Sequence, residues 1–493
     1  MNTVRSRMRM GAMVIAFVAG TAWANNLTVT NVTVLPKDSS TAYVKFDVAW
    51  QNAWYYTNIN HDAAWVFFKV QQEGETDWQH VRLEANQVTN PAGYSVGSGT
   101  NLDFFVPPDK VGMFVRRKVE GAGAVASTNV QAVWNFTSNN LSKNARVKIQ
   151  AFAIEMAYVA QGAFWAGNTS AIINSSFHAQ GSDISPIQIT STNAFTIYWG
   201  AGDGTSASVP AGFPKGYAPF YCMKYEITEG QWVDFFNLLD SSQKSARDIT
   251  GTPGKGTDAV SQRNTVAWAG STNLATTVAP DRACNFLAWA DIIAFSAWAG
   301  LRPMTELEFE KACRGPLAPL SAEFAWGDGM TIGISGLQGT DGSGSEYYTT
   351  GNSHFLGNGG PTTNPNWGAV RAGLFAKLGT SRSGAGASYW GIMELSGNLT
   401  ERPVTVGHAT GRAFTGLHGN GTLTAGGDAD IAALLWPALN GTGAGQRGGA
   451  WRNDSGYLRV ADRVAAAIAD SQRGISAAGN ISPYGGRGVR SAP

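Results

Sequence analysis

The chain has 493 residues, which is too long for one ordinary domain of about 100 to 200 residues. Its 36 basic and 35 acidic residues nearly cancel, so a general nucleic-acid binder is excluded. Hydrophobic residues make up 43% of the chain, enough for a large core, while 60 glycines indicate many turns. These values favour a β-rich or loop-rich extracellular protein.

The first residues have the pattern of a secretory signal peptide. Arg5, Arg7 and Arg9 precede an apolar run over 11–22, and Ala22-Trp23-Ala24 has a small residue on each side of the tryptophan. We therefore expect a signal peptide over 1–24 and a secreted, periplasmic or cell-surface protein. No apolar run reaches the roughly 20 residues that cross a bilayer, so no membrane span is expected.

Residues 25–153 have the periodicity of strands. Apolar residues alternate with others in two runs: Val44, Phe46, Val48 and Trp50, and then Val130, Ala132, Trp134 and Phe136. The run 64–68 is apolar throughout. Clusters of Asn, Gly, Pro and Ser separate these runs, at the spacing of a sandwich. The pattern predicts an antiparallel β-sandwich domain over 25–153.

The remainder, 154–493, has few helical patterns within a glycine-rich background. Thr228 with Gln231, and Thr305 with Glu308, have the spacing of capping boxes. Apolar residues at helical spacing follow the first of these pairs and recur over 290–299. The sequence therefore predicts helices near 229–239, 290–299 and 306–313, and an α+β protein overall.

Six ordered sequence blocks in this part carry a family resemblance. They occupy 154–159, 224–228, 298–310, 397–398, 447–451 and 488–490. Together they resemble the formylglycine-generating enzyme, or sulfatase-modifying factor, family. The resemblance implies that 154–493 is a domain with a variant C-type-lectin fold, rich in irregular structure. Oxidases, iron enzymes and binding proteins share that fold, so the family alone does not assign an activity.

The residues argue against the family's copper chemistry. The oxidases of the family resemble one another in two cysteines after the Gly-Gly-aromatic block, and here Asn453 and Leu458 stand at those places. Neither side chain can ligate Cu(I), which prefers thiolates, so no copper is expected. Glu308 and Glu310 are interpreted as capping and solvent-exposed residues, and no catalytic residue is assigned. The three cysteines are Cys222, Cys284 and Cys313, whose pairing stays open.

A structural calcium site is predicted from the segment 391–401. It resembles the family's calcium-binding turn, which implies carboxylate ligands from Glu394 and Glu401 and carbonyl ligands from Gly397 and Leu399. Hard oxygen ligands on an irregular loop suit Ca²⁺.

The C-terminal segment 451–482 is predicted to be a displayed binding surface. It also resembles the lectin-fold targets of diversity-generating retroelements, in which residues after Gly-Gly-aromatic vary. Aromatic and arginine residues dominate interface energies. The predicted ligand-binding residues are Trp451, Arg452, Asn453, Asp454, Ser455, Tyr457, Arg459, Arg463 and Arg473.

Two functions follow from these patterns. The first is a secreted, non-catalytic ligand-binding or structural protein whose partner is a protein or peptide, with a glycan as a further candidate. The alternative is an oxidoreductase of the same family, of the sulfatase-modifying-factor or nonheme-iron type, acting on a protein cysteine or a small thiol.

Overall fold

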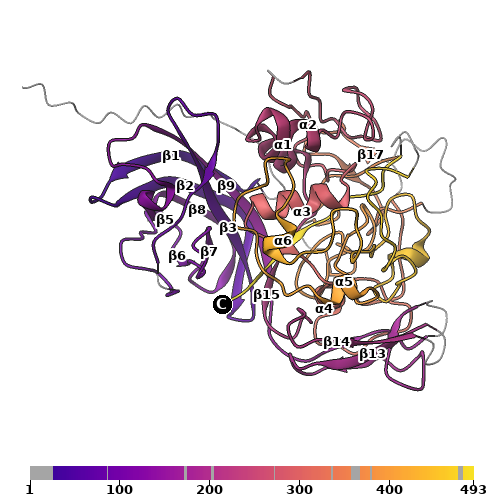
Figure 1. Ribbon diagram of the computed structural model, residues 1–493. Coiled ribbons are helices and arrows are strands. Elements are labelled where there is room, and N and C mark those ends of the chain that lie inside the picture. The colour runs from indigo at the N-terminus through magenta and orange to yellow at the C-terminus, as the bar shows by residue number, and fades with distance from the viewer. Residues whose placement is uncertain are drawn as a thin grey trace, which may run out of the picture.

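The structure is a computed structural model, and it describes residues 26–85, 87–170, 175–200, 205–270, 273–334, 337–356, 367–377, 380–475 and 481–493. The predicted signal peptide over 1–24 lies outside these residues. Figure 1 shows the strands of the N-terminal part on one side and the helices on the other, with β3 and β9 between them. None of the helices in the described ranges has the length and apolar character needed to cross a bilayer.

The N-terminal part is built from long antiparallel strands that enclose an apolar core. The strands are β1 (Thr28–Pro36), β2 (Thr41–Thr57), β3 (Asn60–Gln72), β4 (Gln79–His80), β5 (Ser98–Gly99), β6 (Leu102–Phe105), β7 (Met113–Arg117), β8 (Gly121–Asn135) and β9 (Val147–Val159). A short 3-10 helix, η2 (Phe136–Asn139), follows β8. Strands β1, β2, β5 and β8 pair with one another, and β3 pairs with β4, β7 and β9. Alternate residues of β2, β3 and β8 meet in one buried cluster, as a sandwich requires.

Strand β3 is buried on both faces, which explains its continuous apolar run. Ala64, Val66 and Phe68 point into the sandwich core. Trp65 and Phe67 point the other way and pack in a second cluster with residues of the C-terminal part. Because side chains alternate along a strand, a strand with two covered faces loses the apolar–polar alternation.

The second face of β3 is covered by helices. Helix α1 (Glu229–Asn237) follows the Thr228–Gln231 capping box, α2 (Ser241–Arg247) follows a second box, and α3 is Trp289–Trp298. The ring of Trp298 meets that of Phe67 edge to face, with centroids 5.1 Å apart. Helix α4 (Glu306–Arg314) follows the Thr305–Glu308 box, so the three predicted helices are confirmed.

One sheet joins the two parts of the chain. Strand β15 (Phe220–Met223) pairs with β9, β19 (Gly488–Ser491) pairs with β15, and β16 (Arg302–Pro303) pairs with β19. The boundary predicted between residues 153 and 154 falls inside β9, so backbone pairing rather than a linker connects the two parts. The α+β class is confirmed, since antiparallel sheet predominates and the helices are few and short.

Short elements complete the C-terminal part. They are β10 (Phe164–Ala166), β11 (Phe177–His178), β12 (Ile187–Ile189), β13 (Phe195–Trp199), β14 (Thr205–Val209), β17 (Leu337–Gln338), β18 (Tyr347–Tyr348), α5 (Ala409–Arg412), α6 (Ile431–Leu434) and the 3-10 helix η3 (Ser455–Leu458). Strands β11, β13 and β14 form a separate sheet at the lower edge of Figure 1.

Candidate functional site

A buried arginine, Arg447, precedes the segment 451–482 that is predicted to bind. The guanidinium of Arg447 donates to Glu306 at 3.0 Å, to Glu310 at 2.7 Å and to the carbonyl of Val460 at 2.6 Å. Both glutamates lie in α4 and are buried, as Glu308 is. The interpretation of Glu308 and Glu310 as solvent-exposed is therefore wrong. Arg447 ties the start of the segment to the helix.

A second arginine, Arg487, follows the end of this segment. Arg487 is buried and donates through Nε to the carboxylate of Glu401. Its Nη1 donates to the carbonyls of Met223 at 3.1 Å and Lys224 at 3.3 Å. Because both ends are held by charge-assisted hydrogen bonds, the chain between them starts and ends at fixed places.

Between these arginines, a tight turn brings side chains to the surface. Gly449 has φ of 61°, and a Cβ atom there would lie 2.7 Å from Cδ1 of Leu458, so the position requires glycine. Helix η3 follows, with Leu458 buried beneath it. Asp454 and Tyr457 are exposed, and Arg452, Asn453, Ser455 and Arg459 are half-buried. The turn 452–459 therefore displays six of the nine predicted binding residues.

Two of the other three predicted binding residues belong to the core. Trp451 is buried with its ring against that of Trp367, at a centroid distance of 4.4 Å. Arg463 is also buried, where its Nε donates to Glu306 at 2.7 Å and its guanidinium lies 3.8 Å from the ring centroid of Phe177. These positions cannot meet a ligand from the surface, so their assignment as binding residues is corrected.

Arg473, the third, is half-buried, and its assignment as a binding residue stays a prediction. Its guanidinium donates to Asp291 at 2.7 Å and to the carbonyl of Ala246 at 2.8 Å, which ties the segment to α2 and α3. Arg402, which the sequence did not single out, donates to the carbonyls of Asp470 and Gln472. No local pattern distinguishes these arginines from exposed ones, because their carboxylate partners lie far away in the chain.

Burial and the neighbouring positive charges have opposite effects on the pKa of Glu306, which pairs with both Arg463 and Arg447. Burial would raise the pKa of Glu306, but the guanidinium groups of Arg463 and Arg447 outweigh it and hold that pKa below its ordinary value. Glu306 therefore stays ionised, and the frame beneath the displayed turn keeps its ion pairs.

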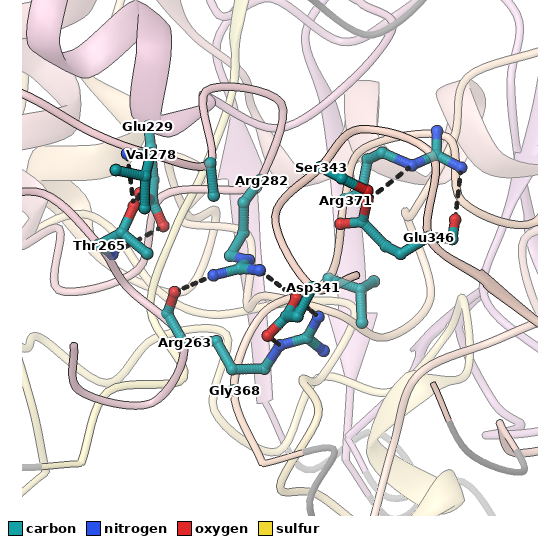
Figure 2. A network of polar contacts seen from close by, with 12 residues as sticks. Glu229, Arg263, Thr265, Val278, Arg282, Asp341, Ser343, Glu346, Gly368 and Arg371 are labelled. Atoms are coloured by element: carbon teal, nitrogen blue, oxygen red, sulfur yellow. Dashed lines mark hydrogen bonds and ion pairs between the residues drawn. The ribbon is translucent and has the colours of Figure 1, made fainter. Parts of the chain in front are cut away.

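A further polar network lies beside the segment, and Figure 2 shows it. Arg263 donates to the carboxylate of Asp341 through Nε at 3.3 Å and Nη2 at 2.6 Å, and Arg282 donates to the same carboxylate. The network adjoins the end of the segment, because the side chain of Gln262 accepts the N–H of Ser482 at 2.7 Å. It also adjoins the start, since Ala283 packs in one cluster with Trp451. Sequence reasoning missed these residues, which share no motif.

Comparison with known proteins assigns the family. The family described as the sulfatase-modifying factor enzyme 1-like domain matches residues 200–476, more than half of the chain. The chain belongs to this family. Among solved structures, Treponema denticola variable protein 1 is similar over 69% of this chain and 96% of its own, with 14% sequence identity and a TM-score of 0.30. No curated protein matches the chain.

The cysteines of this family member do not form a thiolate pair at the turn. Cys222, Cys284 and Cys313 are all free and buried, and burial is the main cause that raises the pKa of each thiol. A raised pKa keeps a thiol protonated and makes it a poor nucleophile and metal ligand. The resemblance described above implies that Asn453 and Leu458 stand at the places of the family's two cysteines.

The predicted calcium ligands fit a cation only in part. Glu394 and Glu401 are buried, and each has one carboxylate oxygen without a hydrogen-bond partner. The other oxygen of Glu401 pairs with Arg487, so a guanidinium already supplies positive charge there. Within the described ranges, no group of three or more His, Cys, Asp or Glu is arranged to hold a metal ion. Calcium at this turn stays a prediction.

Proposed function

We propose that this family member is a secreted, non-catalytic binding protein whose ligand contacts the turn 452–459. The proposal rests on a difference in burial and pairing: the arginines that hold the turn 452–459 are buried and paired, whereas side chains of the turn itself are exposed. These arginines are Arg447 and Arg487, which form buried ion pairs. Asp454 and Tyr457 are exposed and form no side-chain hydrogen bond or ion pair with another described residue, so they are available to a partner, whereas Nη1 of the half-buried Arg452 is buried without a hydrogen-bond partner.

A protein or peptide is the ligand class that the turn suits best. Tyr457 is 45% exposed, and it offers a large ring with a polar end. Arg452 offers planar hydrogen bonding next to it. Tyrosine and arginine dominate the binding energy of protein interfaces. A glycan is the second candidate.

The turn can be tested with a displayed random peptide library as the probe. The triple variant Arg452→Ala, Ser455→Ala and Tyr457→Ala should lose the peptides that the native protein enriches, while its melting temperature stays nearly unchanged. Equal enrichment by the native protein and this variant would contradict the proposal.

A matched control removes the same residue types from the sandwich. Tyr56, Ser142 and Arg146 are exposed and lie outside the C-terminal segment. Their triple alanine variant should enrich the same peptides as the native protein. Loss of enrichment in this control as well would place the binding surface elsewhere.

The enzymatic alternative has its own assay. Purified protein is analysed for copper and iron, and a cysteine-containing peptide is incubated with it to detect oxidation. Stoichiometric redox metal with turnover would overturn the proposal. The resemblance to retroelement targets is tested on the surrounding DNA, where a reverse-transcriptase gene and an imperfect repeat that differs at adenines would support variation of the turn.

A further inference from the structure

Arg263 and Arg282 present two buried positive charges to one carboxylate (Figure 2). Their side chains are 7% and 2% exposed, whereas that of Asp341 is 43% exposed. Burial, followed by the nearby Arg263 guanidinium, lowers the pKa of Arg282. Two guanidinium groups placed this close repel each other, and the carboxylates of Glu229, Asp341 and Glu346 offset that repulsion at Arg282.

Asp341 lies on the segment 339–345, which few other hydrogen bonds connect to the rest of the protein. Among the described residues, the hydrogen bonds that tie 339–345 to the rest of the protein run chiefly through the carboxylate of Asp341. Gly339, Gly342 and Gly344 all have positive φ, between 75° and 81°. Glycine turns of this kind can change conformation at small cost.

Exposed aliphatic residues lie close to both arginines in the chain. Val278 is 76% exposed, and a Cβ atom on Gly342 would lie 3.6 Å from its carbonyl oxygen. Val260, three residues before Arg263, is 64% exposed. A carboxylate that replaces Asp341 gains no net ion pair, so a competing ligand must gain its affinity from such neighbouring contacts.

We propose that Arg263 and Arg282 form a carboxylate-binding site of the ligand surface, which Asp341 occupies in the free protein and an acidic side chain of a protein ligand takes over. The planar, forked donors of arginine match a carboxylate. The site adjoins the displayed segment through Gln262 and Ala283. The inference rests on the proposed function and assigns a class of ligand: a peptide with an acidic residue between aliphatic ones.

The first test is rescue of Asp341→Ala by acetate. The variant should melt at a lower temperature than the native protein, and sodium acetate should recover most of the loss, whereas sodium chloride at the same ionic strength should not. A ligand that binds only the folded state raises its stability in proportion to the logarithm of its concentration. Absence of rescue would overturn the proposal.

Asp470→Ala is the matched control for acetate rescue. Asp470 also pairs with a buried arginine, Arg402, at 3.5 Å, but no second arginine within the described ranges shares its carboxylate. Acetate should recover much less of the loss in this variant. Equal rescue of both variants would show a general salt effect and overturn the assignment of a dedicated site.

The second test uses native protein and does not depend on the variant's folding. Hydrogen exchange of 339–345 should rise several-fold with a capped Val-Asp-Val tripeptide and stay unchanged with capped Val-Asn-Val. Unchanged exchange with both would show that Asp341 is a permanent structural partner. Neither test needs the natural ligand or the turn 452–459, so this inference and the proposed function can fail separately.

Discussion

Replacing Arg447 by methionine removes the cation that two buried glutamates of α4 share. The change deletes hydrogen bonds of 3.0 Å to Glu306 and 2.7 Å to Glu310, as well as one to the carbonyl of Val460. Breaking a buried ion pair from one side costs about 3–5 kcal/mol, because the remaining charge is left without compensation. Glu306 keeps Arg463 as a partner, and Glu310 keeps Arg314. We therefore expect a loss of about 3 kcal/mol, at the lower end of that range.

The measurement is thermal unfolding of the native protein, Arg447→Met and Arg452→Met. Unfolding entropy is about 2.1 cal/mol/K per residue, so one kcal/mol corresponds to about 1 °C for a cooperatively unfolding chain of this length. Arg447→Met should melt about 3 °C lower. Arg452, half-buried and without a carboxylate partner among the described residues, should change stability by no more than about 0.5 kcal/mol.

Equal melting temperatures for the two variants would refute this reasoning. They would show either that the glutamates of α4 find other partners or that the turn is not held at Arg447. A large loss of stability for Arg452→Met alone would show that a residue of the turn itself, rather than Arg447, holds the turn in place.

Three further predictions concern stability. Gly449→Ala should lower the free energy of unfolding in urea by about 2–4 kcal/mol, because φ is positive there and the added Cβ would contact Leu458. Gly456→Ala is the control: its added Cβ would meet open space, so it should cost at most about 0.5 kcal/mol. Burial is the main cause that raises the pKa of Asp62 to about 6 from 3.8, so the folded state holds this proton more tightly and stability should fall as pH rises through that interval. Melting curves of Asp62→Asn should lack this contribution, and an identical pH dependence would contradict the assignment. Removing calcium with a chelator should lower the melting temperature of the native protein more than that of Glu401→Gln, and no effect on either would reject the calcium site.

Some features of this protein follow from short-range patterns and were predicted from the sequence. The capping boxes at Thr228 and Thr305 join residues three positions apart, so the residues themselves specify where the helices begin. The same signal at Asp240 and Gln243 begins α2, which the sequence analysis overlooked. The strand pattern of the sandwich is likewise visible, because side chains alternate with a period of two.

Other features depend on contacts between distant residues. Arg447 and Arg463 donate hydrogen bonds to Glu306, which lies 141 and 157 positions earlier in the chain. No local pattern indicates which arginine will be buried. The uniform apolar run of β3 indicates burial, but only the tertiary structure shows that its second face is covered by α3, which places the predicted domain boundary inside a shared sheet. The sequence alone thus determined the helix starts, the strand class and the family, since these depend on neighbouring residues or on ordered motifs. The tertiary structure decided which charged side chains support the turn and which are free to bind, because burial and ion pairing depend on the whole chain.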